Sequence, residues 1–179
     1  MTAQPAPPPP APPPPEPPLR FLADRMALWG VGQLSSEDLV DAACTALLAG
    51  VDAPALRELA GVARRDAPYE VPLLIPEVAA QLGLDRPEPG PATGAAALAA
   101  LAAMTVRGEL APAAFVSRAQ DLAVHDPALD RRLVHLAADY GYAEDFEEPT
   151  DALDAAALAE ARRLAARPPA PLSRPAPPP

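Results

Sequence analysis

Lysine and asparagine are absent from this 179-residue sequence, and cysteine occurs once. Without lysine there is no Schiff-base nucleophile and no phosphate-binding loop of the Gly-x-x-x-x-Gly-Lys-[Ser/Thr] type. The single cysteine, Cys44, excludes an internal disulfide and any metal site built on a cysteine cluster. Composition alone therefore removes several common kinds of catalytic and metal-binding site.

Positive charge is also scarce, because 14 arginines face 24 acidic residues and leave a formal net charge of −10. Glu16 and Arg174 are the only charged residues in the proline-rich ends, and they cancel. The whole excess therefore lies in the middle of the chain, which polyanions such as DNA, RNA and anionic membrane surfaces repel on average. We expect neither nucleic acid nor a membrane as a partner.

Long hydrophobic runs are missing as well. The longest uncharged stretch of low polarity, residues 89–106, is shorter than the ~20 residues that span a bilayer and consists mostly of alanine. The N-terminus lacks a basic region followed by an apolar core, the pattern of a secretory signal. We expect a cytoplasmic protein.

Proline is abundant, but it is concentrated at the two ends. Of the 28 prolines, 11 lie in residues 1–18 and seven in residues 168–179. The proline ring fixes φ and removes an amide donor, so we predict extended, disordered tails over both ranges. Residues 19–167 are long enough for one folded domain. The Pro/Gly-rich stretch 84–91 is a candidate internal boundary within this domain.

Apolar residues follow helical spacing through most of the domain, and no stretch shows the alternation of a strand. We predict an all-α fold, a single compact domain of seven to eight short helices in a bundle or hairpin array. Ser35, with Asp38 three residues later, is a candidate helix cap. The first expected helix covers about 19–29, the second runs from the Ser35 cap to a stop at Gly50, and the third is opened by Pro54 and reaches Ala63. The others are one that starts at Pro72 or Pro76 and runs to Gly83, then 94–107, 112–124, 127–140 and 151–167, the last capped by Thr150.

One turn sequence occurs twice. Gly32-Gln33-Leu34-Ser35 is echoed 76 positions later by Gly108-Glu109-Leu110-Ala111, and similar apolar residues follow both. Each copy predicts a glycine that ends a helix, a leucine that packs under the turn and the start of the next helix. Two tandem helical hairpins would explain this similarity, and so would convergence on a common turn.

The most informative polar segment is 140–151, which holds three of the seven aromatic residues and five acids. Aromatic rings supply contact area and carboxylates supply charge, as expected at a surface that captures a basic protein. Gly141 and Pro149 predict that this segment is not one uninterrupted helix. The predicted partner-binding residues are Tyr142, Glu144, Asp145, Phe146, Glu147 and Glu148. The alternative is that Tyr140 and Phe146 pack onto the core while the acids favour the N-terminus of the next helix.

These observations favour a non-enzymatic, acidic protein-interaction module that acts by occlusion or scaffolding and needs no cofactor or metal. Immunity proteins, antitoxins and regulatory proteins are of this kind. The sequence shows no recognisable set of catalytic residues, which favours a non-enzymatic protein. Whether the chain is an enzyme is left open.

The second hypothesis is a small enzyme or metal-dependent ligand-binding protein that uses His125, His135 and Asp139. His135 and Asp139 are four residues apart and share one helix face, where they could ligate a metal or act as a base with its orienting partner. No third ligand follows at a telling spacing, and His-Glu-x-x-His is absent. The competing interpretation is an exposed His–Asp pair on an amphipathic helix.

Overall fold

The computed structural model describes residues 17–123 and 131–166, and all regular secondary structure in these ranges is helical. The all-α prediction is confirmed. The predicted tails lie outside the described residues, except that Pro17 and Pro18 open the first helix instead of ending a tail, because proline is well tolerated in the first helical turn. The helices are α1 (Pro17–Gly30), α2 (Ser36–Leu48), α3 (Pro54–Ala60), α4 (Ala67–Leu82), α5 (Pro91–Val106), α6 (Pro112–Ala123), α7 (Arg131–Asp145) and α8 (Asp151–Ala165).

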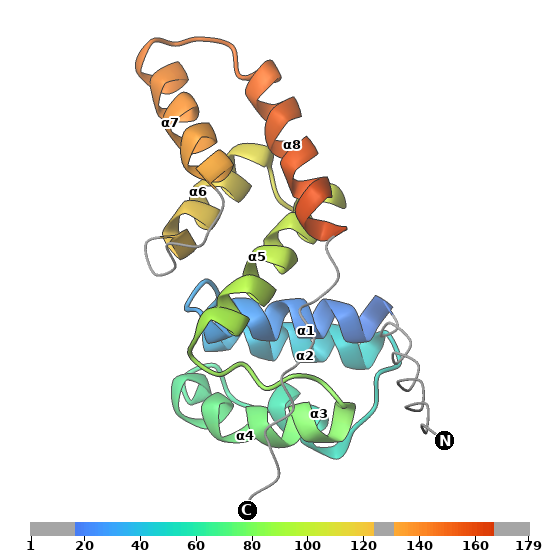
Figure 1. The fold of residues 1–179 in the computed structure, drawn as a ribbon. Coiled ribbons are helices and arrows are strands. Elements are labelled where there is room, and N and C mark those ends of the chain that lie inside the picture. Colours follow the sequence, from blue (N-terminus) through green and yellow to red (C-terminus); the bar gives the residue numbers. More distant parts are fainter. Residues whose placement is uncertain (1–16, 124–130, 167–179) are drawn as a thin grey trace, which may run out of the picture.

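The helices bury two hydrophobic clusters. The first joins α1 to α4, which we call the first half-bundle, around residues such as Met26, Leu39 and Ile75. The second joins α5 to α8, the second half-bundle, and also takes in Leu28 of α1. Helix α1 packs against α5 between the two, with α4 near one end of the molecule and the α7–α8 turn at the other (Figure 1). The boundary proposed at 84–91 falls between the two half-bundles and stays a prediction.

The two similar turn sequences adopt the same backbone geometry. Gly32 has φ 75° and Gly108 has φ 77°, in the left-handed region that glycine tolerates. The amide of Gln33 donates to the carbonyl of Leu28 at 2.9 Å, and that of Glu109 to Met104 at 2.9 Å. These are the bonds of a glycine-terminated helix end. The predicted helix-ending glycines are confirmed at both turns.

The cap predicted at the start of α2 is also confirmed. The amide of Asp38 donates to Ser35 Oγ at 3.1 Å, and the amide of Ser35 donates back to the Asp38 carboxylate at 3.1 Å. These hydrogen bonds from Ser35 lower the pKa of Asp38. The reciprocal pair satisfies two amides that have no partner within the helix.

The cap predicted at the start of α8 is wrong in its detail. Thr150 occupies the capping position but makes no capping hydrogen bond, because its hydroxyl is directed to the Asp154 side chain at 3.4 Å. Asp154 also accepts from Tyr140. The start of α8 is therefore tied to α7 through a side chain, in place of a local cap.

Helix α4 begins earlier than predicted. It starts at Ala67 and carries Pro72 and Pro76 in its interior, although each proline removes one backbone hydrogen bond. The carbonyls left without a donor belong to Pro68 and Pro72, which are exposed, so water can replace the missing amides. On the opposite face the helix buries apolar side chains at helical spacing, and this burial outweighs the two prolines. The buried residues are Ala67, Val71, Ile75, Val78 and Ala79.

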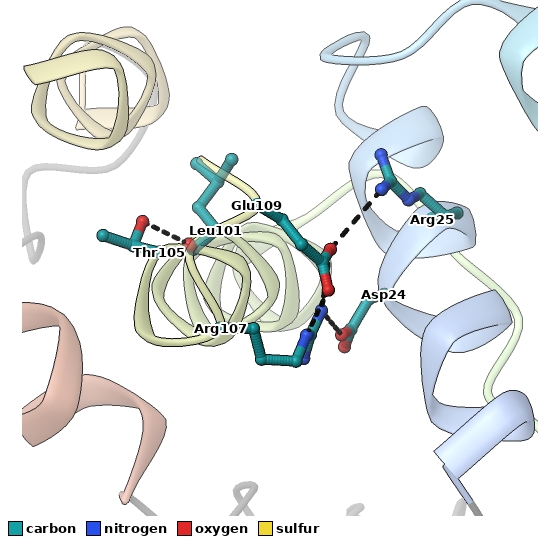
Figure 2. A network of polar contacts seen from close by, with 6 residues as sticks. All are labelled: Asp24, Arg25, Leu101, Thr105, Arg107 and Glu109. Atoms are coloured by element: carbon teal, nitrogen blue, oxygen red, sulfur yellow. Dashed lines mark hydrogen bonds and ion pairs between the residues drawn. The ribbon is translucent and has the colours of Figure 1, made fainter. Parts of the chain in front are cut away.

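A polar network ties α1 to the turn after α5 (Figure 2). Arg107 Nε donates to Glu109 at 2.6 Å, and its Nη2 lies 3.4 Å from Asp24 Oδ2. Arg25 lies 3.7 Å from Glu109. Burial raises the pKa of Asp24 although Arg107 opposes it, whereas the hydrogen bond from Arg107 lowers the pKa of Glu109. The pKa values of the two carboxylates in this network are thus shifted in opposite directions.

The segment between the half-bundles packs tightly against the end of α1. A Cβ atom at Gly30 would lie 2.5 Å from Pro87 Cβ and 3.1 Å from Thr93 Cγ2. The Thr93 hydroxyl donates in turn to the carbonyl of Glu88. Gly30 therefore allows α1, the connecting segment and the first turn of α5 to meet at one point.

Candidate functional site

The segment predicted to bind a partner begins inside a helix. Helix α7 continues through Gly141 to Asp145, beyond the predicted end at Tyr140. The prediction that segment 140–151 is not one uninterrupted helix is confirmed, because residues 146–150 lie between α7 and α8. Tyr140 packs against the second cluster and its hydroxyl donates to Asp154 Oδ1 at 2.7 Å, while Ala143 is buried. Burial and this hydrogen bond raise the pKa of Tyr140. Tertiary contacts on both sides of Gly141 thus hold the helix together.

The end of α7 has an unusual backbone. Glu147 adopts φ 53°, the only positive φ at a non-glycine residue in the described chain. The amide of Glu148 donates to the carbonyl of Ala143 at 2.8 Å, which closes the helix as a glycine would. A side chain in this region costs on the order of 1 kcal/mol. The turn therefore holds Glu147 and Glu148 in place at a cost in stability.

Tyr142 on α7 and Phe146, the first residue after this helix, form an exposed aromatic pair. Their ring centroids are 4.4 Å apart with the planes tilted by 32°, and the residues are 56% and 62% exposed. Of the two rings that the alternative placed on the core, Tyr140 packs there and Phe146 does not. The second half-bundle thus presents apolar area to solvent at its outer end.

The four predicted acids beside this pair are exposed. None of them makes an ion pair with any residue in 17–123 or 131–166. Some acids of the first half-bundle do have partners, since Asp52 pairs with Arg57 and Asp41 with Arg64. The four acids are the last two residues of α7, Glu144 and Asp145, and two residues of the turn that follows, Glu147 and Glu148. The end of α7 and this turn lie at one extremity of the molecule (Figure 1). Together with Tyr142 and Phe146, the four acids form what we call the α7 tip surface.

A groove of about 770 Å³ runs between α6 and α7 beside this surface. Its α6 wall was missed from the sequence, where the only signal is a set of small residues at helical spacing. Glu144, Glu147 and Glu148 of the α7 tip surface also line it, and no lining residue is basic. The lining residues are Ala113, Ala114, Val116, Ser117, Gln120, Ala137, Tyr140, Gly141, Ala143, Glu144, Glu147, Glu148 and Thr150.

His135 and Asp139 lie together on a different groove, of about 460 Å³, between α7 and α8. Both are exposed. The one buried carboxylate there, Glu160, pairs with Arg163 and lies 3.8 Å from Arg132. His125 lies outside the described residues. Among those described, no three His, Cys, Asp or Glu side chains are grouped where they could hold a metal ion.

Searches for similar proteins returned no family model, curated protein or solved structure that matches the chain. None of the helices in 17–123 and 131–166 combines the length and apolar character needed to cross a membrane.

Proposed function

We propose that this chain is a non-enzymatic interaction module that binds a basic protein through the α7 tip surface. The observation that carries the proposal is the joint exposure of Tyr142 and Phe146 among carboxylates that have no ion-pair partner within the described residues. Immunity, antitoxin and regulatory proteins are the functional classes in which such binding by itself is the activity.

The chemistry of the surface suits a cationic partner. Aromatic rings bury a large area for few rotatable bonds, and unpaired carboxylates steer basic proteins toward the site. Tyr142 and Phe146 already hold each other in contact, so part of their side-chain entropy is lost before binding. The strained backbone at Glu147 is also typical of a functional site.

The experiment is affinity capture of partners from a lysate of the native host cells. We expect wild-type protein to retain a specific basic protein, and binding to weaken as salt rises from 50 to 500 mM, because exposed charges are screened. A variant with Tyr142, Glu144, Asp145 and Glu147 changed to alanine should lose this protein.

The matched control is Tyr69→Ala with Leu73→Ala. Both residues are 78% exposed on α4, in the other half-bundle. The control should capture the same protein as wild type. Equal capture by the quadruple variant would remove the α7 tip surface as the binding site.

A further inference from the structure

We propose that the groove between α6 and α7 binds a cationic amphipathic helix of the partner. This inference rests on the proposed function and names the partner element that would bind beside the α7 tip surface. It is argued from the shape of the groove, from Gly141 and from the charge of the lining residues.

Every lining residue of the groove belongs to α6, α7 or the turn before α8, and none belongs to another described helix. Helix α8 packs against both α6 and α7, and α5 packs against α6. The walls of the groove carry small side chains, including Ala113 and Ser117 of α6 and Ala137 of α7. Small residues at a contact allow two helices to approach to the short end of the usual 8–10 Å range. The groove therefore suits a further helix laid against α6 and α7.

Gly141 supplies the second argument. Glycine inside a helix is less favourable than alanine by roughly 1 kcal/mol. A Cβ atom at Gly141 would meet nothing within 4 Å, so no neighbour in the described chain requires a glycine there. Its open side forms part of the groove. A backbone that approaches from outside would make use of the missing side chain.

The charge of the lining residues specifies the occupant. Three of the lining residues are acidic and lie at or just after the C-terminal end of α7: Glu144, Glu147 and Glu148. The other lining residues are neutral. An acidic or neutral helix would leave these carboxylates without partners as water is displaced, whereas arginine or lysine side chains would pair with them. The favoured occupant has small or apolar residues facing the groove floor and basic residues beside the three glutamates.

The test fills the groove without altering an acid or an exposed ring. The probe is a synthetic 18-residue amphipathic helix of lysine, leucine and alanine, compared with the same peptide carrying glutamine for lysine, in fluorescence anisotropy with the full chain. We expect the lysine peptide to bind at least tenfold more tightly than the glutamine peptide. Gly141→Ala should weaken its binding two- to fivefold and Gly141→Leu at least tenfold. Both variants should melt at or above the wild-type temperature, because alanine and leucine favour a helix more than glycine does.

A loss of binding that grows with side-chain size while thermal stability rises would not follow from a purely structural role. Ser117→Leu, which fills the groove from the α6 wall, keeps the test valid if Gly141→Leu misfolds. Wild-type affinity for the lysine peptide in a folded groove-filling variant would overturn the proposal. So would equal binding of the lysine and glutamine peptides.

The same variants separate this inference from the proposed function. If Tyr142→Ala with Phe146→Ala loses the basic protein captured from lysate and Gly141→Leu retains it, the groove proposal fails and the α7 tip surface stands. If neither variant lowers capture relative to the Tyr69→Ala, Leu73→Ala control, both fail.

Discussion

The two half-bundles share a scaffold and differ in what they present to solvent. Displaced by 76 positions, buried residues of α1 and α2 correspond to buried residues of α5 and α6, and the turns between these helices have nearly equal φ values. The corresponding buried pairs are Leu22 and Leu98, Met26 and Ala102, Leu28 and Met104, Leu39 and Phe115, Val40 and Val116, Ala43 and Ala119, and Ala46 and Leu122.

The correspondence weakens at the third helix. Helix α3 has seven residues, whereas α7 has 15 and ends in the α7 tip surface. Asp41 and Asp52 of the first half-bundle have arginine partners, whereas Glu58 and Glu70 have none within the described chain. The α7 tip surface differs in that its four acids without ion-pair partners lie close together in the sequence, beside two exposed rings. The shared positions therefore maintain the fold, and the residues available for binding lie where the halves differ.

The largest effects are expected when one matched pair of buried residues, one from each half-bundle, is truncated. Leu39→Ala should lower the free energy of unfolding by about 2–5 kcal/mol, and Phe115→Ala by about 3–5 kcal/mol, because both side chains are fully buried. Urea denaturation should show one transition for each variant, since α1 contributes to both clusters.

The control for these truncations is Leu48→Ala in α2. Leu48 is 91% exposed, so its removal should change stability by less than about 0.5 kcal/mol. Two separate urea transitions in either core variant would show instead that the half-bundles unfold independently.

A second pair of variants tests whether the two turns are equivalent. Gly32→Ala and Gly108→Ala should each cost about 1–2 kcal/mol, because each places a Cβ atom in the left-handed region. Chemical denaturation measures both values. Losses that differ by more than about 1 kcal/mol would show that the turns are alike only in backbone geometry.

The strained end of α7 predicts a gain in stability. Glu147→Gly should raise the free energy of unfolding by roughly 1 kcal/mol, because glycine adopts φ 53° without a steric penalty. Thermal or urea unfolding would measure the gain. Glu148→Gly is the control and should not raise the free energy of unfolding. A gain of the same size in this control would show that relief of strain at Glu147 does not cause the gain.

The smallest effects concern the polar network between the half-bundles. The pKa of Asp24 is raised by burial, so its ionisation lowers stability as pH rises from about 4 through the raised pKa. Asp24→Asn should therefore gain stability relative to wild type across this range. The pKa of Glu109 is lowered, so its ionised form stabilises the folded chain. This stabilisation is fully present above about pH 4.5 and is lost as pH falls through the lowered pKa.

Glu109→Gln should accordingly be less stable than wild type at pH 7 and approach it in acid. Urea midpoints should be measured for both variants and wild type between pH 3 and 7. Relative to wild type, the midpoint of Asp24→Asn should rise with pH and that of Glu109→Gln should fall. Parallel curves for the two variants would contradict the assignment of opposite pKa shifts within this network.

Much of the fold could be predicted from local signals. Helical spacing indicated the helices, Ser35 and Asp38 indicated a cap, and the two glycine turns were visible as a repeated sequence. The start of α4 and the passage of α7 through Gly141 could not be predicted in this way. In both places contacts with distant residues override a local preference against helix.

The candidate site also has parts that the local sequence indicates and parts that depend on how the helices pack. The aromatic and acidic residues of the α7 tip surface could be picked out because they are close together in sequence. The groove could not, because its walls come from two helices and its shape depends on how they pack. The left-handed Glu147 has no sequence signal either, since glycine or asparagine is the usual residue at such a helix end.

The close packing at Gly30 bears on how the chain is assembled. Two-part proteins can exchange parts between copies when the connecting segment is free to open, and the product is a domain-swapped dimer. Here Pro87 of that segment lies against the end of α1, where there is no room even for a Cβ atom. Thr93, in the first turn of α5, lies against the same point. The connecting segment is thus part of the packing of both halves. Gly30 thereby favours a molecule in which both half-bundles come from the same chain.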